Sequence, residues 1–162
     1  MTRAAWPEPM HLEWLSGRME SIIDEGVTWS ELQRTEKAGV TTRVFSFERD
    51  SHRHLNHPEH YLSPTHLKLQ FCPAYNLITI DFICLPESDR GKGEGTRLLG
   101  YIEELAASLG YQALTLSSML PAEHFWQKNG FQVLDEENHY YPRAMIKPLV
   151  PDLDPEQILC QL

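Results

Sequence analysis

The segment that most restricts the fold of this 162-residue chain is an apolar stretch that runs into a glycine-rich turn and then into an amphipathic pattern. Residues 77–85 are nearly all apolar, and residues 90–95 read Arg-Gly-Lys-Gly-Glu-Gly. Residues 96–109 then carry apolar side chains at helical spacing, namely Leu98, Leu99, Ile102, Leu105 and Ala106. This order predicts a buried strand, a turn with free backbone N–H groups, and a helix that starts at the turn.

Apolar spacing predicts the other elements. We expect a hairpin partner for the buried strand at 67–71, later strands at 113–117, 131–134 and 144–149, and a short helix at 122–128. At the N-terminus, residues 11–24 place apolar side chains on one helical face. Thr28 followed by Glu31 has the spacing of a capping box, so a second helix is expected to end at Gly39, before a strand at 40–49.

The expected order is therefore α-α-β-β-β-α-β-α-β-β. A hairpin that leads into a strand-helix-strand unit predicts an α/β fold with a mixed sheet and helices on its faces. The chain length and a hydrophobic content of 41% predict one domain over residues 1–162, with the N-terminal helices in 1–39.

Charge and hydropathy restrict the partners. The net charge of -9 disfavours nucleic acid and favours small cationic molecules or basic peptides. No apolar run approaches the roughly 20 residues of a membrane span, and the first residues lack the apolar core of a signal peptide. We therefore expect a cytoplasmic protein without a membrane partner. Pairing of edge strands into a homodimer is left open.

The glycine turn is suited to an anion. Its free N–H groups and the positive end of the following helix favour phosphate or pyrophosphate, and Arg90 and Lys92 add positive charge. A P-loop would need Ser or Thr after Gly-Lys, but Gly93 follows Lys92. A Rossmann turn would need glycine where Thr96 stands. Hydrolysis of ATP and binding of NAD are therefore disfavoured.

The sequence resembles the GNAT superfamily of N-acetyltransferases. Arg90, Gly93 and Gly95 match its Q/R-x-x-G-x-G/A signature after a central strand. Residues 122–131, Ala-Glu-His-Phe-Trp-Gln-Lys-Asn-Gly-Phe, resemble its second motif, A-x-x-L-Y-E-K-x-G-F. The resemblance covers about residues 67–148, which it marks as the cofactor-binding core.

The resemblance implies acetyl-CoA as cofactor, a sheet splayed at the cofactor site, and transfer of an acetyl group to a primary amine by direct aminolysis. Amides of the glycine turn would hold the pyrophosphate, and the backbone at the end of the central strand would follow the pantetheine. The implied cofactor-binding residues are Ile83, Cys84, Leu85, Arg90, Gly91, Lys92, Gly93, Glu94, Gly95, Thr96, Ser118 and Trp126.

Catalytic residues are predicted less directly. Asp81 is the best candidate base, because an acid within an apolar strand is expected to have a raised pKa. An outward-facing ion-paired carboxylate is the alternative interpretation. His124 and His139 are other candidates, since histidine titrates near neutral pH.

The second motif departs from the family at the residue that commonly protonates the leaving CoA thiolate. Trp126 stands in place of that tyrosine, so either the thiolate leaves unaided or Tyr140 or Tyr141 substitutes. The family's usual asparagine is also replaced, by Met119, with Ser117 and Ser118 just upstream. The resemblance therefore implies an N-acetyltransferase first, and these departures motivate one alternative, a CoA-binding sensor or interaction module with weak turnover.

A histidine-rich loop is expected between residues 50 and 66. Its spacing could bring imidazoles to a metal ion, but without a cysteine or a fixed scaffold we expect no metal site. We predict instead that the loop borders the acceptor cleft. The histidines concerned are His52, His54, His57, His60 and His66.

Overall fold

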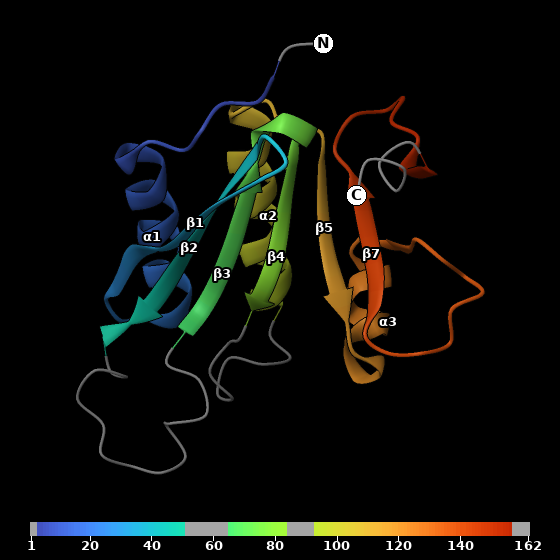
Figure 1. The fold of residues 1–162 in the computed structure, drawn as a ribbon. Coiled ribbons are helices and arrows are strands. Elements are labelled where there is room, and N and C mark those ends of the chain that lie inside the picture. The colour runs from blue at the N-terminus through green and yellow to red at the C-terminus, as the bar shows by residue number, and fades with distance from the viewer. Residues whose placement is uncertain (1–2, 51–64, 84–92, 157–162) are drawn as a thin grey trace.

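A computed structural model describes residues 3–50, 65–83 and 93–156. Within them the chain forms a seven-stranded sheet with the order β1-β2-β3-β4-β5-β7-β6, shown in Figure 1. Only β4 and β5 are parallel, and the other neighbours are antiparallel. The elements are α1 (Pro9–Ile23), β1 (Val27–Lys37), β2 (Val40–Arg49), β3 (Thr65–Cys72), η3 (Pro73–Tyr75), β4 (Leu77–Ile83), α2 (Glu94–Ser108), β5 (Ala113–Ser118), α3 (Leu120–Lys128), β6 (Gln132–Val133) and β7 (Arg143–Pro148).

The predicted mixed α/β sheet is confirmed, but the second N-terminal helix is wrong. The segment after α1 is β1, which pairs with β2 along almost its whole length. Thr28 does not cap a helix, because its hydroxyl is hydrogen-bonded to Asp50 Oδ1 at 3.2 Å. Trp29 points toward α1 and donates its Nε1–H to Glu13 at 2.9 Å. The β2 partner therefore overrides the local capping pattern, and the observed order is α-β-β-β-β-α-β-α-β-β.

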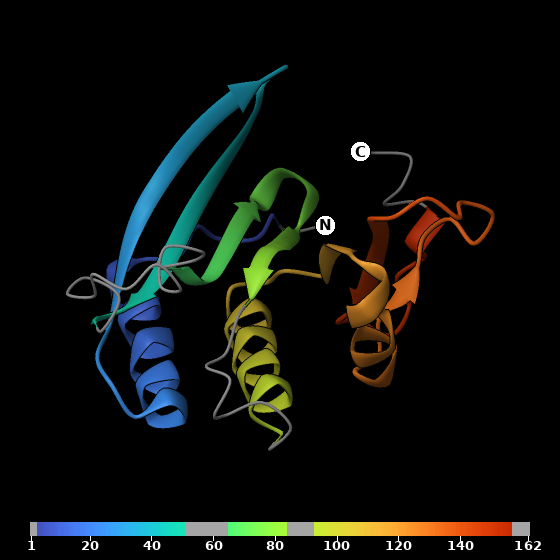
Figure 2. The same ribbon diagram turned by 90° about the horizontal axis from the view of Figure 1, so that it is seen from below.

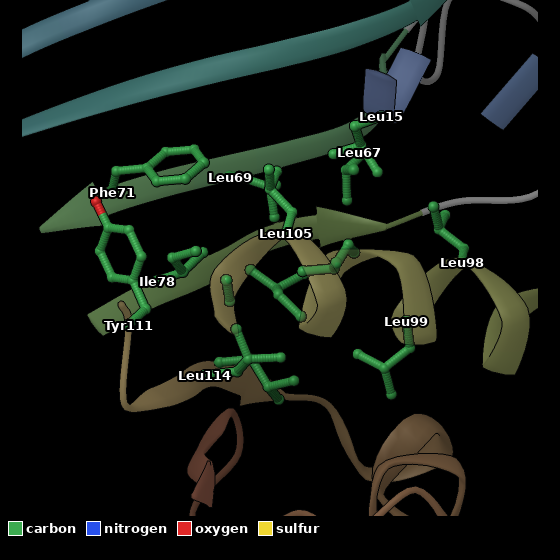
Figure 3. Packing of buried hydrophobic residues seen from close by; sticks show 14 of the residues in the cluster. Leu15, Leu67, Leu69, Phe71, Ile78, Leu98, Leu99, Leu105, Tyr111 and Leu114 are labelled. Atoms are coloured by element: carbon green, nitrogen blue, oxygen red, sulfur yellow. The ribbon is translucent and has the colours of Figure 1, made fainter. Parts of the chain in front are cut away.

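One face of the sheet carries the main core. Leu67, Leu69 and Phe71 of β3 are 0% exposed, and the register places Phe47 and Phe45 of β2 beside the two leucines. Directly paired residues point to the same face, so these side chains form one apolar surface. Figure 3 shows Leu67 and Leu69 of this surface facing the apolar side of α2. The buried residues of α2 are Leu98, Leu99, Ile102, Leu105 and Ala106.

The helices pack on this apolar surface. Helices α1 and α2 lie side by side, as Figure 2 shows from below. Helix α3 joins the same core through Trp126, which belongs to the buried cluster that also includes Met145 of β7. The β1–β2 hairpin extends beyond the end of β3, because β3 pairs only with the part of β2 from Arg43 onward. No helix in the described segments is long and apolar enough to cross a bilayer.

Candidate functional site

The parallel strands β4 and β5 separate before either of them ends. Their pairing begins at Leu77 and Ala113 and stops at Ile80 and Leu116. Strand β4 continues to Ile83 and β5 to Ser118, so the last residues of both strands lack each other as partners. Figure 1 shows the two strands diverging in this direction. The opening leaves backbone N–H and C=O groups of two central strands free to bind an extended ligand.

A glycine starts the helix that follows β4. Gly93 is the N-cap of α2, and its carbonyl accepts the amide of Arg97 at 3.1 Å. Its φ of +78° lies in the left-handed region, and a Cβ built there would meet no atom of the described residues within 4 Å. The first turn holds Glu94, Gly95 and Thr96, whose amides lack intrahelical acceptors by helix geometry. The fit to an anion therefore comes from open space beside a positively polarised helix end.

Part of the predicted cofactor site lies outside the described residues. This holds for Cys84, Leu85 and residues 90–92 of the turn, so their roles stay predictions. Ile83 is the last residue of β4, half-buried, and pairs with Leu67 on β3. It lies beyond the last β4–β5 pair, at the opening.

Asp81 is the extra residue of a bulge in β4. The register shifts so that Ile80 pairs with Leu69 and Phe82 pairs with Lys68, which leaves Asp81 without a partner across β3. Bulges re-aim side chains and occur often beside active sites. The carboxyl group reaches the surface, but the surrounding protein partly removes it from water and so raises its pKa, while the Lys68 ammonium acts in the opposite direction. A raised pKa brings a carboxylate closer to the range of a general base.

Two other predicted cofactor contacts lie on the β5 side. Ser118 is 1% exposed, and its hydroxyl donates to the carbonyl of Met119 at 2.9 Å. Trp126 is 6% exposed and packs edge-on against Phe125 and Phe131, with ring centroids 4.9 and 5.3 Å away. Most of the indole therefore fills the core. By contrast, Met119 is 58% exposed at the start of α3.

The two candidate tyrosines differ in their surroundings. Tyr140 is 85% exposed. Tyr141 is half-buried and hydrogen-bonded to the Glu123 carboxylate, which raises the pKa of the phenol. Because its proton is held by Glu123, Tyr141 is a weaker acid than a free tyrosine. His124 and His139 are exposed and lie on α3 and in the segment before β7.

An ion pair missed by the sequence reasoning joins α3 to β7. Arg143 binds Glu123 through both carboxylate oxygens, with Nε to Oε2 at 3.1 Å, and its Nη1 donates to the carbonyl of Asn138 at 3.0 Å. Both charged side chains are 11% exposed. Since Ser118 pairs with Arg143, the ion pair lies beside the open end of β5. A bidentate geometry of this kind fixes the position of α3 on the sheet.

This ion pair predicts a pH-dependent contribution to stability. The Arg143 guanidinium lowers the pKa of Glu123, so the stabilisation is present above the ordinary glutamate pKa and is lost as the pH falls through the lowered value. Glu123→Gln should therefore reduce the melting temperature at pH 7 and have a smaller effect at pH 3. Glu104→Gln, at an exposed position of α2, is the control. An equal loss at both pH values would contradict a charge-based role.

No metal cluster forms among the described residues, as no three His, Cys, Asp or Glu side chains converge there. The histidine-rich loop lies outside them, apart from His66 in β3, so its role stays a prediction. A cavity of about 400 Å³ opens between α1 and the C-terminal half of α2, near Trp14 and Leu105. It belongs to the helical side of the sheet, away from the opening of β4 and β5.

Comparison with known proteins gives the family. The profile described as "Acetyltransferase (GNAT) family" matches residues 46–131, just over half of the chain, and this range includes β4, the glycine turn, α2, β5 and α3. No curated protein matches the chain.

Several solved structures match most of the chain's length at low identity. An acetyltransferase of the GNAT family from Staphylococcus aureus Mu50 is 11% identical, with 67% of this chain and 69% of that chain covered and a TM-score of 0.46. Nourseothricin acetyltransferase is 17% identical, with 91% and 97% covered and a TM-score of 0.44. PaiA N-acetyltransferase from Thermoplasma acidophilum, solved with coenzyme A, is 18% identical, with 66% and 60% covered and a TM-score of 0.45. From the match to the family profile, the chain belongs to the GNAT acetyltransferase family.

Proposed function

We propose that the protein transfers the acetyl group of acetyl-CoA to the primary amine of a small molecule or of a basic peptide. The main support is the opening between β4 and β5 together with the left-handed Gly93 at the start of α2, the helix that follows β4 in the chain. This arrangement offers free strand backbone for an extended arm and free helix amides for a pyrophosphate. Acetyl-CoA has both parts, and when bound it supplies a thioester whose carbonyl carbon can be attacked by an amine.

The proposed reaction is direct aminolysis. The amine nitrogen forms a bond to the acetyl carbon, the carbon–sulfur bond breaks, and the nitrogen loses a proton. Asp81 is the proposed acceptor of that proton, because it lies at the bulge beside the opening and its pKa is raised by partial burial. The net charge of -9 favours approach of a cationic acceptor.

Departure of CoA does not require a tyrosine in this proposal. A thiol of pKa about 8.5 is an acceptable leaving group near neutral pH. The phenol of Tyr141 keeps its proton in a hydrogen bond to the Glu123 carboxylate. The side chain of Tyr140 is largely in solvent. We therefore assign protonation of the thiolate to solvent.

The alternative is a CoA-binding module with little turnover, which the buried position of Trp126 favours because no acid stands in its place. Thiol release from acetyl-CoA, followed with a panel of spermidine, benzylamine and a lysine-containing peptide, separates the two. We expect amine-dependent release and an acetylated product by mass spectrometry. Tight binding of CoA with no acetylated product from any of the three amines would favour the alternative.

A further inference from the structure

Two threonine hydroxyls join the central strands one residue pair before the strands separate. Thr79 of β4 and Thr115 of β5 are paired by register, and their Oγ1 atoms are 2.8 Å apart. The next pair along, Ile80 and Leu116, is the last before the strands separate. Thr115 is 8% exposed and Thr79 is half-buried. The hydroxyl pair is thus a largely buried polar contact, and only one residue pair separates it from the opening between β4 and β5.

These hydroxyls lie on the sheet face opposite the helices. Ile78 and Ile80 of β4 belong to the main core, as do Leu114 and Leu116 of β5, so alternation directs the threonines to the other face. Gln70 of β3 pairs with Thr79 and therefore projects on the same face. We call Gln70, Thr79 and Thr115 the polar floor.

The polar floor interrupts a sheet face that is apolar two residues earlier in both β4 and β5. Two residues earlier in each strand, Leu77 and Ala113 occupy the same face and are buried in a small apolar cluster. Apolar side chains would therefore pack there, and valine would satisfy the strand preference of both threonine positions. Burial of hydroxyl groups instead carries a desolvation cost that hydrogen bonding must offset.

The hydrogen-bonding capacity of the pair is only partly used. Two hydroxyls have two donors and four acceptor positions, and their mutual bond uses one of each. In the described part of the chain, neither hydroxyl has another hydrogen-bond partner. One O–H and several lone pairs thus remain, which is the complement of a group with N–H donors such as an amine or ammonium.

We propose that the polar floor binds the amino group of the acceptor and holds its nitrogen next to the opening between β4 and β5, on the sheet face opposite the helices. This inference rests on the proposed function and adds the residues that select and orient the amine. Asp81 stands two residues beyond Thr79 in the same strand, at the bulge. An amine held by the hydroxyls is therefore close along β4 to the proposed base, and the strand ends proposed to bind the cofactor begin just beyond the next residue pair.

The test uses near-isosteric variants of the full chain. Thr79→Val and Thr115→Val remove a hydroxyl while retaining a β-branched side chain, and Thr79→Ser keeps the hydroxyl. Ser30→Ala is the matched control, because Ser30 and Ser46 form a second cross-strand hydroxyl pair in the described part of the chain, 3.3 Å apart on β1 and β2, and β3 separates these strands from β4. Spermidine and benzylamine are the acceptor probes.

We expect each valine variant to raise KM for the amines by about tenfold, the effect of losing one hydrogen bond to a charged group. KM for acetyl-CoA and Kd for CoA should stay within about twofold, the range of a neutral substitution. Thr79→Ser and Ser30→Ala should behave like the wild-type protein. If the wild-type protein turns over neither amine, calorimetric binding of spermidine to the CoA complex replaces KM.

Three outcomes would overturn the inference. An unchanged amine KM, or an equal loss of acetyl-CoA affinity, would show that the hydroxyls do not bind the acceptor. Failure of the wild-type CoA complex to bind spermidine or benzylamine would have the same meaning. Failure of the wild-type protein to bind CoA would instead overturn the proposed function, so the two failures are distinguishable.

Discussion

Gly93→Val is expected to remove detectable binding of CoA while leaving the protein folded. The φ of Gly93 is +78°, a conformation that a β-branched residue strongly disfavours. The left-handed conformation costs an L-residue about 1–2 kcal/mol, so relaxation to a negative φ would turn the amides at the start of α2 away from the pyrophosphate. Crowding by the described residues is not the cause, because none of their atoms lies within 4 Å of a Cβ at this position. Calorimetric titration with CoA measures the effect.

The chain contains a closely matched control for this variant. Gly39 has the same φ of +78° and the same open surroundings, but it lies in the turn between β1 and β2. Gly39→Val should therefore lower the melting temperature by a similar amount and leave CoA affinity unchanged. If both variants keep wild-type affinity, the pyrophosphate does not bind at the start of α2.

Asp81→Asn is expected to lower kcat by about 10²- to 10⁴-fold, the usual contribution of a general base. The amide cannot accept the proton of the amine, and it has nearly the same size as the carboxyl group. Affinity for CoA should not change. Glu36→Gln, which removes a carboxylate from the end of the β1–β2 hairpin beyond β3, is the control and should keep full activity.

The pH dependence of Asp81 has a definite sign. Its raised pKa means that the folded protein binds this proton more tightly than the unfolded chain, so stability from this group falls as the pH rises through the interval above 3.8. Asp81→Asn removes that penalty and should not lower the melting temperature at neutral pH. In the wild-type protein, kcat/KM should rise with pH through the raised pKa of Asp81. A variant with unchanged kcat and an unchanged pH profile would exclude Asp81 as the base.

The centre of the fold could be predicted from sequence because its signals are local. The apolar run of β4, the amphipathic spacing of α2 and the intervening glycines each identify one element over a short stretch. The prediction of a second N-terminal helix was wrong because it too relied on a local signal. Thr28 and Glu31 have a helix-start spacing, but the choice between helix and strand was decided by β2, whose pairing is not visible in a local pattern.

In the candidate site too, the residues with a local sequence signal could be predicted, and the contacts between distant residues could not. Gly93 and Asp81 could be identified because one is part of a spaced motif and the other interrupts an apolar strand. The Thr79–Thr115 hydrogen bond spans 36 positions, and the Glu123–Arg143 ion pair spans 20. The first depends on the register of β4 and β5, and the second on the docking of α3 against β7, so neither is visible in a local pattern. The only local sign of the first is a threonine at an alternate position of each buried strand.

The most direct test of the account is native mass spectrometry of the purified wild-type protein with added acetyl-CoA. We predict a one-to-one complex with acetyl-CoA or CoA that Gly39→Val retains and Gly93→Val loses. A wild-type protein that remains free of either ligand at millimolar acetyl-CoA would contradict the assignment of the opening between β4 and β5 as a CoA site.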